Sequence, residues 1–288
     1  MKRLIVFLIL NLFFIPPGYS YYLRDEVMEK EMTICETLNR IESELGAEVS
    51  YIEYREPGVM REKGMLYGIA GSFTARKLSL FSDEVDNWML RLEARFAWGK
   101  MDYKNSGTME NIPDYLIEAR AIMGYDFPLL VNTIFTPYFG FGYRYLNDDS
   151  GGKISSTGAY GYERESNYFY SPLGFETNTS LKKGLWSWGI KAEYDIFWQG
   201  RQISHLSDVD PGYSDVKNKQ KRGYGLRGAL RIKKENERIS FLVEPFIRYW
   251  NIKRSDYALY TLYGIPWGYA YEPKNNSREI GVKLAIGF

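Results

Sequence analysis

Apolar and polar residues alternate along most of the chain, in ten segments that begin near Ala47. In the clearest segments, Trp88–Gly99, Leu185–Trp198 and Glu279–Phe288, nearly every second residue is apolar. A period of two places the apolar residues on one face of a β-strand and the polar residues on the other. Weaker copies of the pattern lie at 48–56, 64–77, 113–127, 133–147, 164–178, 221–234 and 237–254. The pattern predicts an all-β protein of about ten strands, within a range of eight to twelve.

Tryptophans mark both ends of the apolar rows, and their spacing distinguishes a membrane barrel from a soluble one. Trp88 and Trp98 are ten residues apart, and so are Trp188 and Trp198. At about 3.3 Å per residue and a tilt near 40°, ten residues rise roughly 25 Å, the height of the lipid-facing band of an outer-membrane barrel. The predicted membrane girdle comprises Trp88, Trp98, Trp186, Trp188 and Trp198.

The opposite face of the same strands carries charged residues of both signs, separated by glycines. Nine cations and seven anions fall on it, so the set is nearly neutral and is able to pair inside a narrow lumen, where unpaired charges are costly. The predicted lumen charge network comprises Arg91, Glu93, Arg95, Glu118, Arg120, Arg144, Glu176, Lys191, Glu193, Asp195, Arg227, Arg231, Glu244, Arg248, Glu279 and Lys283.

The connections between segments alternate in length. Those at 78–85, 131–132, 179–184 and 234–236 are short, whereas those near 102–112, 148–163, 199–220 and 255–276 are longer and polar. Short turns on one side and long loops on the other are typical of outer-membrane barrels, whose termini are periplasmic. The fold expected is a transmembrane antiparallel up-and-down β-barrel. Phe288, the last residue of the final apolar row, resembles the C-terminal signal that the barrel assembly machinery reads.

The N-terminal region has a different pattern. Lys2 and Arg3 precede an apolar run of about 12 residues, and Gly18-Tyr19-Ser20 supplies small residues for cleavage, which predicts a signal peptide over 1–20. Apolar residues from Met28 to Leu45 then recur at steps of three and four, which predicts a short helix over 25–45 with the single Cys35 on its buried face. The domain division expected is therefore signal peptide 1–20, periplasmic helical segment 21–46 and barrel 47–288.

Composition and charge exclude several classes of function and of binding site. The net charge of +1 provides no general basic field for nucleic acid, and one Cys makes neither an internal disulfide nor a cysteine-based zinc site. We expect no cofactor and no metal, because the sequence contains no phosphate-binding glycine loop and no cluster of metal ligands. A mean hydropathy of −0.37 argues against membrane helices but not against a barrel.

The mature region resembles the uncharacterised outer-membrane β-barrel proteins of Gram-negative bacteria. The resemblance rests on the predicted signal peptide and on Tyr51–Gly58, Pro137–Leu146, Ile203–Asp208 and the terminal Phe288. It implies an outer-membrane location, with membrane lipid and lipopolysaccharide as neighbours and the assembly machinery as a partner. It implies no activity, and nothing in the sequence indicates the oligomeric state.

The only histidine, His205, is the centre of an enzymatic alternative. In size and strand number the chain is similar to the omptin proteases, but their catalytic Asp-x-His is absent because position 203 is Ile. The pair His205-x-Ser207 resembles the His-x-Ser of the smaller outer-membrane lipid A deacylases, in which Ser is the nucleophile and His its base. The acid would then be Asp208, Asp210 or Asp215.

Two further functions remain open. A ten-stranded barrel is too narrow for a general porin, although a narrow selective channel is compatible with the sequence. The loops 146–164 and 255–277 suit adaptable surface binding, because their aromatics stand among small polar residues; these are Tyr160, Tyr162, Tyr257, Tyr260, Tyr263, Trp267, Tyr269 and Tyr271. The leading expectation is an outer-membrane barrel with a structural or surface-binding role and a lumen closed by charges.

Overall fold

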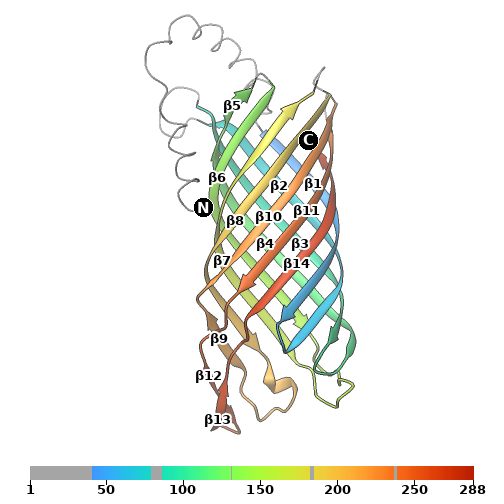
Figure 1. The fold of residues 1–288 in the computed structure, drawn as a ribbon, viewed down its shortest axis with the longest axis vertical. Coiled ribbons are helices and arrows are strands. Elements are labelled where there is room, and N and C mark those ends of the chain that lie inside the picture. Colours follow the sequence, from blue (N-terminus) through green and yellow to red (C-terminus); the bar gives the residue numbers. More distant parts are fainter. Residues whose placement is uncertain (1–40, 79–85, 131, 182–184, 237–238) are drawn as a thin grey trace, which may run out of the picture.

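Ten long antiparallel strands form a closed barrel in the computed structural model, which describes residues 41–78, 86–130, 132–181, 185–236 and 239–288 (Figure 1). The barrel strands are β1 (Ile41–Glu56), β2 (Met60–Leu78), β3 (Trp88–Lys104), β4 (Met109–Tyr125), β6 (Thr133–Asp149), β7 (Glu163–Ser180), β8 (Trp186–Ser204), β10 (Gly223–Glu235), β11 (Ser240–Ile252) and β14 (Asn275–Gly287). Each pairs with its neighbours in the order β10-β11-β14-β1-β2-β3-β4-β6-β7-β8, and pairing of β8 with β10 closes the ring. The predicted all-β barrel of ten strands is confirmed.

The alternation along the strands is that of a membrane barrel. On β3, the inward Met89, Arg91 and Arg95 are at most 7% exposed, whereas the outward Leu92 and Trp98 are 60% and 46% exposed. Apolar residues therefore cover the outside and charged residues the inside, the reverse of a soluble barrel. Within the described ranges, no helix is long and apolar enough to cross a membrane.

The two ends of the barrel differ (Figure 1). At the end that we call the long-loop end lie the connections 150–162, 205–222 and 253–274, which contain the 3-10 turn η1 (Leu206–Asp208), β9 (Val216–Gln220) and the hairpin of β12 (Ala258–Leu262) and β13 (Ile265–Ala270). The opposite, short-turn end carries β5 (Phe127–Leu130) and the C-terminus. Strand pairing extends further into the long loops than the sequence indicated, because β8 continues to Ser204 and pairs there with β9.

The predicted helix over 25–45 is wrong at its C-terminal end, since β1 begins at Ile41, and the predicted division at residue 46 falls inside a barrel strand. Ile41 and Leu45 are both outward and exposed, with Glu44 buried between them. A spacing of four is one helical turn and also two periods of a strand, so the apolar steps alone did not separate the two structures. The predicted signal peptide and residues 21–40, including Cys35, lie outside the described residues.

Candidate functional site

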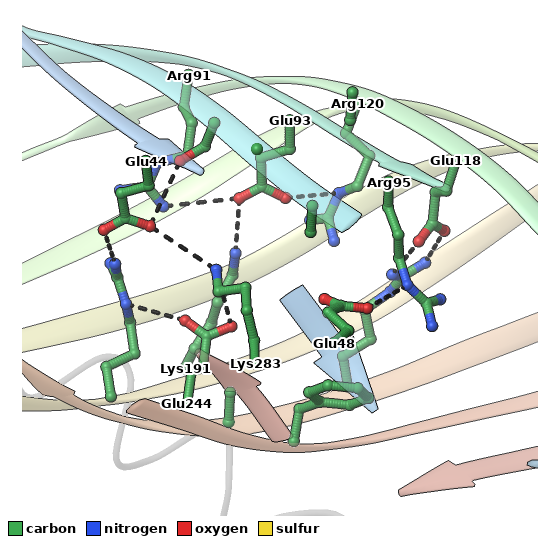
Figure 2. Close-up of a pocket in the computed structure, with 18 of the residues that line it drawn as sticks. Glu44, Glu48, Arg91, Glu93, Arg95, Glu118, Arg120, Lys191, Glu244 and Lys283 are labelled. Atoms are coloured by element: carbon green, nitrogen blue, oxygen red, sulfur yellow. Dashed lines mark hydrogen bonds and ion pairs between the residues drawn. The ribbon is translucent and has the colours of Figure 1, made fainter. Parts of the chain in front are cut away.

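Ion pairs connect the charged side chains that point into the lumen (Figure 2). Glu93 accepts from Lys191 at 2.9 Å, and Arg227 contacts Asp195 at 2.7 Å and Glu118 at 2.5 Å. Arg248 lies 3.1 Å from Glu48, which Arg95 also contacts at 2.5 Å. Because every strand contributes an inward row of such residues, the pairs join strands that are distant in the sequence.

Arg144 differs from the other predicted lumen charges. The other members each form at least one ion pair with a described residue. No carboxylate of the described chain lies within ion-pair distance of Arg144. Its guanidinium instead lies over the rings of Tyr168 and Trp250, 5.9 and 5.6 Å from their centroids. These rings belong to a buried cluster with Tyr170, Phe197 and Ile252.

Several lumen charges escaped the sequence prediction. They are Glu42, Glu44, Glu48, Arg76, Asp126 and Lys233. The ion pairs of Glu44, Glu48, Arg76 and Asp126 belong to the same network, and Lys233 pairs with Glu42 beside it. Added to the nine predicted cations and seven predicted anions, they make the two signs equal in number. Glu42 and Glu44 were missed because the sequence analysis assigned residues 25–45 to a helix. Their acidic side chains at even positions, next to the apolar residues at odd positions, already indicated a strand.

Near the long-loop end the interior becomes acidic. Arg164 contacts Glu56 at 2.9 Å, Glu62 at 3.1 Å and Asp148 at 2.5 Å, so three buried carboxylates share one guanidinium. Asp114, the register partner of Asp148, is also buried. Within the described ranges, no group of His, Cys, Asp and Glu side chains is arranged to hold a metal ion.

The outward aromatics form ring contacts around the barrel. Toward the long-loop end, Trp98 stacks on Phe96 at 5.3 Å and Trp198 is 60% exposed. Toward the short-turn end, Trp88 packs edge-on against Tyr125 at 5.3 Å, and Trp186 and Trp188 are exposed. All five tryptophans of the predicted girdle thus face outward. The C-terminal Phe288 is exposed as well, and its backbone pairs with Ser43 at 2.9 and 3.0 Å.

His205 lies on the outer wall at the long-loop end, not in the lumen. Beyond Trp198, β8 alternates exposed Arg201 with buried Gln202, and the next outward positions are Ile203 and His205. Nδ1 of His205 is 2.9 Å from Asp215 and Nε2 is 3.3 Å from Glu165. Partial burial lowers the pKa of His205, but hydrogen bonds to the two carboxylates outweigh it and raise that pKa above its ordinary value.

The structure does not bring the proposed nucleophile to the histidine. The hydroxyl of Ser207 donates to Asp215 at 2.7 Å, and in the described chain both ring nitrogens of His205 face carboxylates. Asp208 accepts from the backbone of Glu163, and Asp210 accepts from that of Gly212. The loop therefore uses the Ser207 hydroxyl to bind a carboxylate, and Asp208 and Asp210 to bind backbone amides. In the described chain, the His205 ring has no free nitrogen to take a proton from a hydroxyl.

The β12–β13 hairpin exposes aromatic side chains beyond the barrel. Tyr263 is 76% exposed, Tyr269 71% and Trp267 61%; Tyr160, Tyr257 and Tyr271 are also exposed, whereas Tyr162 and Tyr260 are half-buried. The hairpin is tied to the preceding loop by a bridge between Tyr213 and Leu262 and by a 2.7 Å hydrogen bond from the Tyr263 amide to the Gly212 carbonyl. Because its backbone is fixed and its rings are exposed, the β12–β13 hairpin forms a preformed contact surface.

Comparison with solved structures shows the fold. The outer-membrane protease OmpT from Escherichia coli has a TM-score of 0.60 at 10% identity, with 88% of this chain and 99% of that chain covered. Less similar are the translocator domain of the autotransporter NalP from Neisseria meningitidis (TM-score 0.42, 10% identity, 90% and 94% covered) and the Pseudomonas putida toluene transporter TodX (0.35, 10%, 93% and 94%). No protein-family model matches the sequence, and no curated protein is similar to it. The chain therefore has an outer-membrane β-barrel fold, and these similarities specify no activity.

Proposed function

We propose that this protein is an integral outer-membrane barrel of a Gram-negative bacterium, with its long loops outside the cell and its termini in the periplasm. Its lumen is closed, and its function is binding at the cell surface through the loops. The observation that carries this proposal is the paired charge network, which fills the interior with side chains that hold one another. The outward apolar rows support the membrane location.

Closure of the lumen follows from the cost of opening it. A continuous water path requires several buried ion pairs to separate, and each separated buried charge costs several kcal/mol without its partner. The buried rings of Tyr168, Tyr170 and Trp250 add aromatic bulk beside Arg144 and Arg227. The space left beside the network is about 90 Å³, room for only a few water molecules, and most of the residues that line it are charges of the network.

Binding is assigned to the β12–β13 hairpin because exposed Tyr and Trp offer large, rigid contact area at low entropic cost. The catalytic alternative lacks such support, since Ser207 donates to Asp215 and not to His205. The likeness to OmpT rests on the fold alone and adds no catalytic residue.

Two measurements test the proposal. In planar bilayers, folded protein is expected to show no steady conductance; a stable ionic current would overturn the closed lumen. On a glycan array that includes bacterial surface polysaccharides, nanodisc-embedded protein is expected to bind. Replacement of Tyr263, Trp267 and Tyr269 by Ser should abolish the signal while the heat-modifiable gel shift of the barrel is retained. Equal binding by this variant, or none by either protein, would count against a surface-binding hairpin.

A further inference from the structure

A row of cations lies on the outer wall of the barrel at the long-loop end. It consists of Arg201 on β8, Lys217 and Lys219 on β9, and Arg222 and Lys253 beside them; we call it the basic row. Arg201 and Lys219 are direct register partners, and the backbone of Lys253 donates to that of Arg222 at 2.9 Å. The five residues therefore form one continuous patch across neighbouring chain segments, in the region where Figure 1 labels β9.

The side chains of the patch point away from the barrel. Gln202, Asn218 and Gln220 alternate with the cations along β8 and β9, and they are at most 3% exposed. Because successive residues of a strand face opposite sides, Arg201, Lys217 and Lys219 must face outward, and all three are exposed.

These outward cations lack the partners that the lumen charges have. No described carboxylate forms an ion pair with any member of the basic row. The neighbouring Lys221 pairs with Asp256 at 2.5 Å. Two other carboxylates on this wall, Glu165 and Asp215, contact His205 and no member of the basic row. Like charges directly opposite on adjacent strands destabilise a sheet, so the Arg201–Lys219 pair calls for an anion from outside the chain.

The height of the patch indicates where that anion resides. Arg201 follows the exposed Trp198 by three residues on β8, and the stacked rings of Tyr194 and Tyr224 lie further toward the membrane centre. Outward aromatic rings lie at the interface of a barrel with the membrane, so cations just beyond them reach the level of the lipid headgroups.

The corresponding wall of β3 is different. Lys100 and Lys104 also follow an exposed tryptophan, Trp98, but Asp102 stands between them on the same face. The basic row is therefore a local excess of positive charge and not a general property of this end of the barrel.

We propose that the basic row binds the phosphate groups of a phosphorylated glycolipid of the outer leaflet, such as lipid A. Arg201 and Lys219 together hold one phosphate, with Arg201 offering a planar fork of donors and Lys219 a point charge. Lys217, Arg222 and Lys253 extend the patch to a second phosphate of the same headgroup. This assignment rests on the proposed outer-membrane location, because such lipid is found at that surface.

The test uses full-length folded protein in nanodiscs that contain a zwitterionic phospholipid and a small fraction of lipid A, with retained lipid counted by native mass spectrometry. The test variant is Arg201→Gln/Lys217→Gln/Lys219→Gln, and the matched control is Lys63→Gln/Lys100→Gln/Lys104→Gln. One cation near an anionic membrane surface contributes about 1 kcal/mol, or about fivefold in affinity. On that scale three cations acting together contribute about a hundredfold, so we expect the test variant to retain lipid A at least tenfold less well. The control, whose Lys100 and Lys104 flank Asp102, should lose at least fivefold less than the test variant does.

Three outcomes would overturn the proposal: equal retention by the test variant and the wild type, equal losses in both triple variants, or equal retention of lipid A and its dephosphorylated form. Complete competition by millimolar inorganic phosphate would also overturn it, since it would assign the patch to free anions. All variants are first checked for the heat-modifiable shift, and a poorly folded triple variant is replaced by Lys219→Gln alone. Nanodiscs expose both membrane surfaces, so the result is independent of orientation in cells and of the hairpin test above.

Discussion

Removal of a shared lumen carboxylate gives the sharpest test of the ionic network. Glu176 accepts from Arg91 through both of its oxygens, each at 2.6 Å, and from Arg76 at 2.9 Å. The change Glu176→Gln keeps the size of the side chain and removes its charge. Arg91 then retains the hydroxyl of Thr74 at 2.9 Å and Glu93 at 3.9 Å, and Arg76 retains Asp126.

The expected loss follows from burial. The side chains of Glu176, Arg91 and Arg76 are at most 7% exposed, so solvent does not screen the broken pair. Breaking a buried pair by removing one partner costs about 3–5 kcal/mol, and the contacts that the arginines retain place the expected value at about 3 kcal/mol. The exposed pair Lys221–Asp256 is the control: its side chains are 68% and 55% exposed, and Asp256→Asn should cost less than about 1 kcal/mol.

Both variants are measured by urea unfolding and refolding in phospholipid vesicles, followed by tryptophan fluorescence. A third variant, Arg91→Met/Glu176→Met, removes both charges and should recover most of the loss, because an apolar pair of similar volume needs no counterion. If Glu176→Gln costs no more than Asp256→Asn, or the double variant is less stable than Glu176→Gln, the buried ion pairs of the network do not stabilise the barrel.

Three further predictions concern other parts of the fold. Arg164→Gln should lower the free energy of unfolding in urea by several kcal/mol, because three buried carboxylates lose the guanidinium that they share; a loss below about 1 kcal/mol would contradict this. The pKa of His205 is raised, so its stabilisation of the loop is complete below its ordinary value of 6.5 and is lost as pH rises through the raised value. Limited proteolysis of that loop should therefore accelerate with rising pH in the wild type, and His205→Gln should remove the dependence. Gly142→Ala should cost about 1–3 kcal/mol, because the added methyl group overlaps the fully buried ring of Tyr170; an unchanged urea midpoint would contradict this packing.

The strands that the sequence predicted best are those with the most regular alternation. In β3 and β8, bulky apolar residues occupy one parity and charged or small residues the other, so the two faces are unambiguous. β1 was predicted seven residues short, because Ile41 and Leu45 fit a helical spacing as well as a strand. The ends of β8, β3 and β4 were also short, since beyond the membrane band the outward residues become polar and the alternation disappears.

For the candidate site, the sequence predicted which side chains point inward but not which partners they meet. The lumen charges were predictable where the alternation is regular, because parity alone assigns a side chain to the inside, and six were missed where it is weak. The sequence did not indicate that Arg144 lacks a carboxylate and lies over Tyr168 and Trp250, since its neighbours come from β7 and β11. Nor did it indicate that His205 lies between Asp215 and Glu165, because Glu165 is forty residues away and is brought close by the pairing of β7 with β8.

By itself, the sequence determined the ten-stranded barrel, the faces of its most regular strands and the near-neutrality of its interior, because a period of two is a local property of the chain. The tertiary structure alone decided which opposite charges meet, that three carboxylates share Arg164, and that the cations of β8 and β9 stand together without partners. The register between strands sets those distances, and register depends on how distant segments align around the closed sheet.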